Sequence, residues 1–272
     1  MIKIVKKTLQ QSNHLLSNRL QQFLIDPSRQ VVSSSAIPIY CKRHPPPAFL
    51  KTPNLQNYKN KVLPRKIRVL VDMDGVLADF EKSLIQIYQK EAPNLPVLPT
   101  YLRKGLCIDQ QYDEFFKQDW PQAGEKLRNI MMREHFFRDL PPIAEAVNKV
   151  HCLLDNPNYD VSICTAPLTH NAFCTSEKLE WLEKFFGKRF KRKVIMTNDK
   201  TLINADILLD DKEHIVGAID EPSFTHILVR QKHNQHVTGH DRKYILENWN
   251  MLDEMLEELI QDKFLVESEK LA

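Results

Sequence analysis

Two aspartates separated by a single residue are the first sign of chemistry in this chain. Asp72 and Asp74 follow the short apolar run Ile67 to Val71, and Gly75 comes next. Alternate residues leaving a strand point the same way, and two carboxylates this close repel each other unless a cation lies between them. Magnesium takes oxygen ligands and completes its shell with water and phosphate oxygens. Taken alone, the run fits magnesium-assisted phosphate chemistry and an ordinary polar turn equally well.

Three further predicted strands also end in polar groups. Tyr159 to Cys164 is followed by Thr165, Lys193 to Thr197 by Lys200, and Ala205 to Leu209 by Asp210 and Asp211. A hydroxyl can donate to a phosphate oxygen, and a lysine can neutralise phosphate charge. Two adjacent acids after a buried strand need a partner, which a metal ion supplies. Four strands that each end in a group required for phosphoryl transfer predict a catalytic site.

The elements that position these groups indicate an α/β domain from about residue 66 to residue 272. The first strand is apolar throughout most of its length, as expected for an inner strand of a parallel sheet covered on both faces. Further elements are predicted as a fifth strand, Thr225 to Val229, and as helices at Ile143 to Leu154, Ser176 to Phe186 and about Tyr244 to Phe264. The predicted fold class is a Rossmann-like, three-layer parallel sheet.

A small helical cap is predicted between the first strand and the rest of the sheet, at about residues 80 to 140. Its helical segments are Phe80 to Lys90, Gln110 to Lys117 and Ala123 to Arg133, and prolines at 93, 96 and 99 break the first from the second. A cap above a phosphate site is where a leaving group is held.

Composition excludes several classes of protein. The 272 residues are 42% hydrophobic and 27% charged, as in a soluble globular protein, and no apolar run approaches the roughly 20 residues of a membrane span. Six scattered glycines cannot form a Walker-type phosphate loop or a dinucleotide-binding turn. Five cysteines without a C-x-x-C pair argue against a zinc cluster or a disulfide framework, and favour a reducing compartment.

The first 65 residues differ in charge from the rest. Residues 1 to 71 contain eight lysines and five arginines against one aspartate, although the whole chain carries only +3. The apolar residues Leu9, Leu16, Leu20, Phe23 and Leu24 are predicted to form one face of a basic helix, a pattern that resembles a mitochondrial import signal. A disordered tail and a tether to anionic membrane or nucleic acid are the alternatives. Residues 36 to 65 are proline-rich and are predicted to be a linker.

The motifs from Lys66 to about Leu256 resemble the haloacid-dehalogenase-like phosphatase superfamily and, within it, the 5′(3′)-deoxyribonucleotidases of mitochondrial type. The matching segments are Asp72-Met73-Asp74-Gly75-Val76-Leu77-Ala78-Asp79-Phe80, Ile163-Cys164-Thr165-Ala166-Pro167, Ser176-Glu177-Lys178, Asn198-Asp199-Lys200-Thr201, Ala205-Asp206-Ile207-Leu208-Leu209-Asp210-Asp211 and His233-Asn234-Gln235-His236. The two histidines of the last segment are predicted to belong to a hydrogen-bonded loop rather than to a metal site.

The resemblance implies a role for each site residue. Asp72 is the expected nucleophile, Asp74 the proton donor and acceptor, and Thr165 and Lys200 the groups that hold phosphoryl oxygens. Mg²⁺ is the expected cofactor, bound by Asp72, Asp211 and the backbone carbonyl of Asp74, with Asp210 in support. Phe80 and Phe137 match aromatic pocket positions of the family. Ala166 stands where a phosphate-binding serine is common, and Leu106 and Cys107 stand where mitochondrial relatives have aromatics.

The activity implied is hydrolysis of deoxyribonucleoside monophosphates through an aspartyl-phosphate. A phosphatase for another small phosphate ester and a catalytically silent nucleotide-binding protein remain as alternatives. The expected partner is a small nucleotide, with no nucleic acid and no membrane span, and the family suggests a homodimer. The leader favours the mitochondrial matrix, with the cytoplasm as the alternative.

Overall fold

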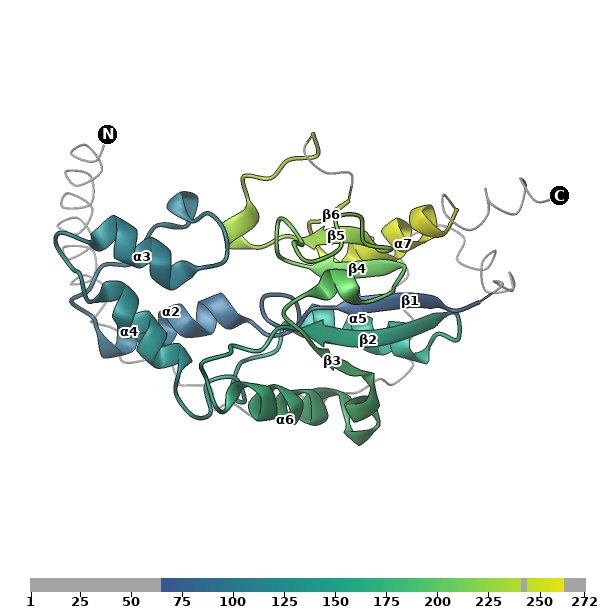
Figure 1. Ribbon diagram of the computed structural model, residues 1–272, viewed down its shortest axis with the longest axis horizontal. Helices are drawn as coiled ribbons and strands as arrows, with labels where there is room; N and C mark the ends of the chain where they lie inside the picture. The colour runs from purple at the N-terminus through teal and green to yellow at the C-terminus, as the bar shows by residue number, and fades with distance from the viewer. Residues whose placement is uncertain (1–64, 241–243, 262–272) are drawn as a thin grey trace, which may run out of the picture. The chain divides into compact units, whose positions relative to one another are not determined.

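The computed structural model describes residues 65–240 and 244–261, with residues 189 and 191 described by their backbone alone (Figure 1). The predicted import signal and linker lie outside the described residues, as does the end of the predicted C-terminal helix. No helix of the described ranges is long and apolar enough to cross a membrane.

One parallel sheet of six strands forms the centre of the described domain. The strands are β1 (Ile67–Val71), β2 (Tyr159–Thr165), β3 (Val194–Met196), β4 (Ile207–Asp210), β5 (Thr225–Val229) and β6 (Ile245–Leu246). Their order is β3-β2-β1-β4-β5-β6, and every neighbouring pair is parallel. The first five strands were predicted from sequence with ends within two residues of those observed. The α/β, Rossmann-like fold class is confirmed.

The order of the strands reverses direction at β1, which is where open parallel sheets bind ligands. Val71 of β1 pairs with Ile163 of β2 on one side and with Leu209 of β4 on the other. The N–H of Asp72 donates to the carbonyl of Leu209 at 2.9 Å. The residue after β1 is therefore fixed beside the last residues of β4.

The two faces of the sheet are covered differently. Val69, Val71 and Leu209 belong to a large apolar core shared with the helices α5 (Ala144–Asp155), α6 (Cys174–Phe186) and α7 (Leu252–Ile260). On the other face, Leu70 and Leu208 belong to a small cluster with Cys164, Ala205 and Phe224. Among the described residues, the cover on that second face comes from the 3-10 turn η4 (Lys200–Leu202) and the loops that follow β3 and β4.

The predicted cap is a group of three helices between β1 and α5, on the side toward which the strands point (Figure 1). They are α2 (Phe80–Glu91), α3 (Ile108–Phe116) and α4 (Ala123–Met131), with the 3-10 turn η2 (Thr100–Leu102) before α3. Tyr88 and Tyr112 meet edge to face with ring centroids 5.5 Å apart, and both are fully buried. The cap therefore has an aromatic core, as expected for a small helical layer that packs on itself.

The predicted C-terminal helix begins later than the sequence indicated, so the predicted start at Tyr244 is wrong. Ile245 and Leu246 form β6, paired with Leu228 and Val229 at the edge of the sheet. The N–H of Arg230 donates to the carbonyl of Leu246 at 3.0 Å. Pairing with the edge of β5 gives the backbone of these two residues hydrogen-bond partners in the sheet, although their spacing also fits the helix that follows. The 3-10 turn η6 (Trp249–Met251) leads into α7.

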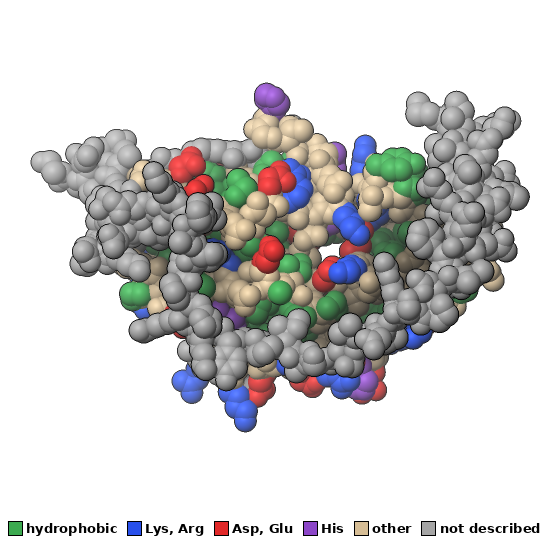
Figure 2. All heavy atoms as spheres, turned by 180° about the vertical axis from the view of Figure 1, so that it is seen from behind, with side chains coloured by type: hydrophobic (Ala, Val, Ile, Leu, Met, Phe, Trp, Pro, Cys, Tyr) green, Lys and Arg blue, Asp and Glu red, His purple; other side chains and the backbone are tan. Residues whose placement is uncertain are grey.

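The visible surface of the domain mixes charges of both signs, as the view from behind shows along its lower edge (Figure 2). Opposite charges meet in exposed or half-buried pairs, including Arg138 with Asp139 at 3.0 Å and Lys126 with Glu91 at 2.8 Å. Such exposed pairs each stabilise a protein by about 1 kcal/mol or less, so they describe a solvated surface rather than a structural core.

Candidate active site

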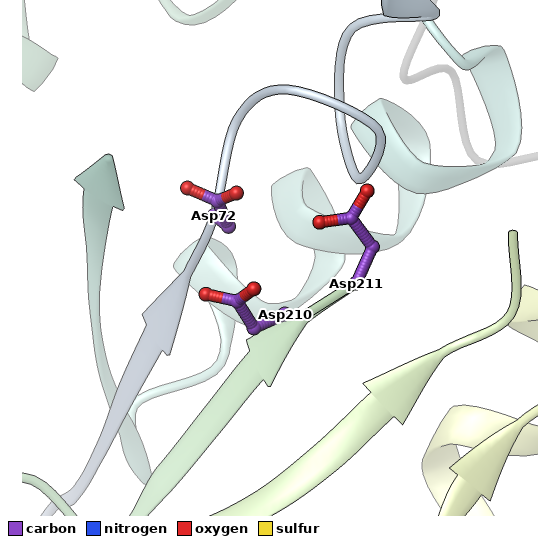
Figure 3. Close-up of side chains that lie close together, drawn as sticks. All are labelled: Asp72, Asp210 and Asp211. Carbon is purple, nitrogen blue, oxygen red and sulfur yellow. The ribbon is translucent and has the colours of Figure 1, made fainter. Parts of the chain in front are cut away.

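Three buried carboxylates meet at the carboxyl ends of β1 and β4 (Figure 3). Asp72 follows β1, Asp210 ends β4, and Asp211 comes directly after it. One oxygen of each carboxylate lies within 4.8 Å of the others, and the three residues are at most 5% exposed. Strands that neighbour each other at the reversal of the sheet bring these residues together, although Asp72 is more than 130 positions from the other two in the chain.

The turn after Asp74 passes directly against Asp211. Gly75 has φ of +77°, a left-handed conformation that favours glycine. A Cβ atom at this position would lie 2.0 Å from Oδ2 of Asp211. The side chain of Gln231 also donates to the carbonyl of Gly75. Glycine is therefore required here for two reasons, since both the backbone conformation and the space beside Asp211 exclude a side chain.

Asp211 is held in place through its own backbone. Its carbonyl oxygen accepts from the Nδ2 of Asn234 at 2.9 Å and lies 3.0 Å from the Nε2 of His233. Both partners are buried in the loop that follows β5. The predicted hydrogen-bonded loop is confirmed for His233, while His236 lies at the surface, 3.1 Å from a carboxylate oxygen of Glu213.

Two buried lysines hold the aspartates of the first motif. The Nζ of Lys200 lies 2.7 Å from Oδ1 of Asp72 and also contacts the carboxylate of Asp210. The Nζ of Lys178 lies 2.7 Å from Oδ2 of Asp74 and donates to the hydroxyl of Thr165 at 2.9 Å. Each carboxylate of the Asp-x-Asp pair thus has its own ammonium group.

Lys178 is a site residue to which sequence reasoning gave no role. It lies on α6 and is 1% exposed, between the buried residues Cys174 and Trp181. A lysine on the apolar face of an amphipathic helix is uncommon unless it has a buried partner, and that position was the available signal. Glu81 and Arg103, which pair at 3.0 Å at the edge of the pocket, were also missed.

The surroundings shift the pKa values of Asp72 and Asp74 in opposite directions. Burial acts to raise the pKa of Asp72, but the ammonium groups of Lys200 and Lys178 outweigh it and hold that pKa below its usual value. Burial raises the pKa of Asp74, Lys178 partly offsets this, and the negative charge of Asp72 adds to the rise. Neighbouring carboxylates whose pKa values are pushed apart are suited to separate roles as nucleophile and proton donor.

The carboxylate cluster has the character of a site for a hard divalent cation. Burial raises the pKa of Asp211 well above its usual value, and the charges of Asp210 and Asp72 raise it further. Within the described part of the chain, Oδ1 of Asp74 is buried without a hydrogen-bond partner. Buried carboxylates that repel one another are stabilised by a metal ion, and an all-oxygen donor set fits Mg²⁺. The carboxylates of Asp72, Asp210 and Asp211 therefore fit a divalent metal ion.

A pocket of about 300 Å³ opens between the carboxylates and the cap. Its lining includes most of the residues predicted for the site: Asp72, Asp74, Asp211, Thr165, Ala166, Phe80 and Phe137. The predicted residues Lys200 and Asp210 are buried beside Asp72 and are not part of that lining. The structure therefore brings the predicted polar and aromatic groups to one cavity, with Lys200 and Asp210 adjoining it.

The cap side of the pocket combines aromatic and aliphatic side chains with the charged side chains of Glu81, Arg103 and Asp109. The rings of Phe80 and Phe137 are stacked, with centroids 6.1 Å apart and an interplanar angle of 30°. Leu106 and Cys107, just before α3, also line the pocket and are exposed. This side of the cavity offers flat apolar surface with a more open rim.

The sheet order, the Asp-x-Asp turn after β1 and the paired acids after β4 are the arrangement expected from the resemblance to haloacid-dehalogenase-like phosphatases. A haloacid-dehalogenase-like hydrolase from Streptococcus pneumoniae is similar with a TM-score of 0.46 and 11% identity, over 70% of this chain and 98% of that one.

Residues 65–264 match the family model described as "5' nucleotidase, deoxy (Pyrimidine), cytosolic type C protein". The mitochondrial 5′(3′)-deoxyribonucleotidase of Mus musculus is 37% identical over 195 residues, which cover 72% of this chain and 87% of the relative. The cytosolic-type enzyme of Homo sapiens is 37% identical over 186 residues, or 68% of this chain and 90% of the relative. This chain belongs to the 5′(3′)-deoxyribonucleotidase family, which confirms the resemblance seen in its motifs.

Proposed function

We propose that this protein is a magnesium-dependent 5′(3′)-deoxyribonucleotidase, which hydrolyses deoxyribonucleoside monophosphates to nucleoside and phosphate. The observation that carries the proposal is a single pocket with carboxylates at its base and stacked phenylalanines in its cap wall. A phosphate fits the first and a nucleobase fits the second. Membership of the nucleotidase family supports the assignment of the carboxylates to the phosphate and of the phenylalanines to the base.

In the first step, the ionised carboxylate of Asp72 attacks the phosphorus atom. An oxygen of Asp72 forms a bond to phosphorus while the bond from phosphorus to the nucleoside oxygen breaks. Asp74 gives its proton to that leaving oxygen, and the nucleoside departs as the neutral alcohol. The opposite pKa directions of Asp72 and Asp74 favour this division of roles.

In the second step, water replaces Asp72 on phosphorus. The carboxylate of Asp74 takes a proton from the water molecule, whose oxygen then forms the new bond to phosphorus. The bond between phosphorus and Asp72 breaks, which restores the carboxylate of Asp72 and releases phosphate. Asp74 ends the cycle protonated, as it began.

The remaining polar groups hold the phosphoryl group. The hydroxyl of Thr165 lines the pocket and is oriented by Lys178 at 2.9 Å. Lys200 carries positive charge to the base of the pocket and keeps Asp72 ionised. Asp72, Asp211 and the carbonyl of Asp74 would hold Mg²⁺ beside Asp210, and the ion would neutralise charge shared by the carboxylates and the phosphate.

Phe80 and Phe137 provide the proposed surface for the base, and Leu106 with Cys107 forms the rim on that side. Side chains of this kind contact a base without reading its hydrogen-bonding edge. The exposed rim favours a second candidate function, hydrolysis of another small phosphate ester, through the same two steps at Asp72.

Mitochondrial import by the basic leader and assembly as a homodimer complete the proposal. Similar relatives include mitochondrial and cytosolic proteins, so the proposal of import rests on the composition of the leader rather than on the family. Uptake and shortening of the full chain by isolated mitochondria would support import, and a chain left outside would favour the cytoplasm. Light scattering of the purified protein would measure the mass of the assembly.

Phosphate release by the purified full chain tests the proposed activity. The panel contains deoxyribonucleoside and ribonucleoside monophosphates and sugar phosphates, each with magnesium and with EDTA. We expect release that requires magnesium and is fastest with deoxyribonucleotides. Metal-dependent release that is fastest with a sugar phosphate would show that the substrate is another phosphate ester and not a nucleotide. Nucleotide binding without release under any condition would contradict the enzyme and favour a binding protein.

A further inference from the structure

Two consecutive residues of α6 reach the two sides of the pocket. Lys178 contacts Asp74 and Thr165 at the base of the pocket, as described above. Glu177, one residue earlier, contacts the backbone of residues 135–138, which we call the return segment because the chain leaves the cap through it. One turn of α6 therefore contacts both Asp74, the proposed proton donor, and the return segment, which carries Phe137.

The carboxylate of Glu177 accepts hydrogen bonds from three backbone N–H groups of the return segment. One oxygen accepts from His135, and the other accepts from Phe137 at 3.0 Å and from Arg138 at 3.3 Å. Glu177 is 3% exposed. Hydrogen bonds to an ionised acceptor are stronger than neutral ones, and a buried carboxylate depends on them to offset its lost hydration.

The return segment has a conformation that its own sequence does not favour. His135 has φ of +74°. Within the described ranges, it is the only residue other than glycine with positive φ. A left-handed residue of this kind costs about 1 kcal/mol or more and persists when its surroundings impose it. The N–H of His135 is one of the three donors to Glu177, and its carbonyl accepts from the N–H of Asp139 at 3.0 Å, so this carboxylate is one of the groups that hold the turn.

Phe137 is the residue through which this turn reaches the pocket. Its N–H is the second donor to Glu177, and its ring is 1% exposed and lines the cavity. The ring stacks on Phe80, and the Nζ of Lys178 lies 5.3 Å from its centroid. Glu177 therefore fixes the backbone from which this ring projects, while Phe80 and Lys178 contact the ring itself.

We infer that Glu177 is a positioning residue that holds Phe137 in the wall against which the base of the substrate lies. The inference rests on the proposed nucleotidase activity. It assigns Glu177 an effect on substrates that carry a base and no direct effect on phosphate transfer, because its carboxylate contacts the return segment and not the reacting groups.

Other side chains hold the ends of the surrounding chain. Asn171 donates to the carbonyl of Met131 at 2.8 Å, and the indole of Trp181 donates to the carbonyl of Leu140 at 2.7 Å. Neither contact involves the side chain of Glu177, so both are expected to remain when it is replaced. The substitution Glu177→Gln therefore loosens the middle of the return segment while its two ends stay attached to the core.

The test compares Glu177→Gln with wild type in the full chain, using a deoxyribonucleoside monophosphate and deoxyribose 5-phosphate, which lacks a base. Misplacement of the ring is expected to lower kcat/KM for the nucleotide about tenfold, mainly through KM, with less than about a twofold change for the base-free ester. Partial unfolding lowers both values equally and leaves their ratio unchanged. Glu180→Gln, the same change at an exposed position of α6, is the matched control.

A second comparison shows whether Glu177 acts through the ring. Phe137→Leu is expected to lower the same ratio, and the double variant is expected to be no worse than Phe137→Leu alone, because the ring is then absent. Additive losses, or an unchanged ratio in Glu177→Gln, would overturn the inference and leave the proposed function intact. A wild-type protein that hydrolyses no deoxyribonucleotide would overturn both.

Discussion

The two sides of the pocket differ in the chemistry and the burial of their side chains. On the sheet side, Asp72 and Asp74 are held at strand ends by buried lysines at 2.7 Å. On the cap side, Phe80 and Phe137 offer apolar surface, and Leu106 beyond them is 41% exposed. Under the proposed function, the chemistry belongs to the buried, charged edge of the sheet, and the choice of substrate belongs to the side chains of the cap. Changes on the sheet side should lower kcat, and changes on the cap side should raise KM.

The largest effect is expected on the sheet side, from Asp72→Asn. The amide cannot act as the nucleophile, so phosphate release should fall by about 10⁴-fold or more. The thermal unfolding midpoint should change little, because Lys200 keeps its contact with Asp210. Asp139→Asn, at an exposed aspartate beyond the return segment, is the control. Retained activity in Asp72→Asn would contradict the role of the sheet edge.

A matched pair of glycines tests how closely the sheet side is packed. Gly75→Ala places a Cβ atom 2.0 Å from Asp211, at φ of +77°. Gly105→Ala introduces the same kind of backbone strain at φ of +73°, with nothing within 4 Å. We expect kcat to fall roughly 100-fold in the first variant and to change little in the second. Equal losses would show that strain, and not the position of Asp211, controls turnover.

A smaller effect is expected on the cap side, from Phe80→Leu. Loss of the ring that stacks on Phe137 removes flat surface for the base without touching the carboxylates. KM for a deoxyribonucleotide should rise about tenfold, with kcat within about threefold of wild type. Steady-state kinetics over a range of substrate concentrations separates the two constants. A fall in kcat at unchanged KM would remove the distinction between the two sides.

The smallest effect is expected at the opposite ends of the same strands, from Asp206→Asn. Burial raises the pKa of Asp206, but Arg65 and the N–H of Arg68 outweigh it and hold that pKa below its usual value. The stabilisation is therefore present above the unfolded pKa of about 3.9 and is lost as pH falls through the lower folded value.

Asp206→Asn should thus lower the free energy of unfolding by about 1 kcal/mol at neutral pH, with a smaller difference near pH 3. Urea unfolding at both pH values measures this. The kcat of the folded protein should stay unchanged, which separates the strand ends that hold the site from those that only stabilise the sheet. A difference that grows as pH falls would contradict the assigned ion pair.

Much of the sheet side could be predicted from the sequence. An apolar strand followed by Asp72 or by Asp210 can be recognised in the sequence, because each pattern is contained in fewer than ten residues. Contacts between distant segments leave no such signal. The pairing of Lys178 with Asp74 depends on where α6 lies relative to the turn after β1, and the hydrogen bonds of Glu177 depend on the path of the chain out of the cap.

The strand at Ile245 and Leu246 was hidden for a related reason. Its apolar residues fit the period of the helix that follows, and only the open edge of β5 decides in favour of the sheet. The aromatic wall was anticipated at Phe80 and Phe137 through the family resemblance. The stacking of the two rings, which are far apart in the chain, required the structure.

The most direct test of the central claim is to locate the phosphoryl group during turnover. The full chain is mixed with magnesium and a deoxyribonucleotide whose phosphate is radiolabelled, quenched rapidly in acid, reduced with borohydride and digested for peptide mapping. An aspartyl-phosphate at Asp72 predicts labelled protein after the quench, and reduction of that one side chain to homoserine. Labelling of another residue, or rapid turnover with no labelled protein at any time, would contradict the assignment of Asp72 as the nucleophile.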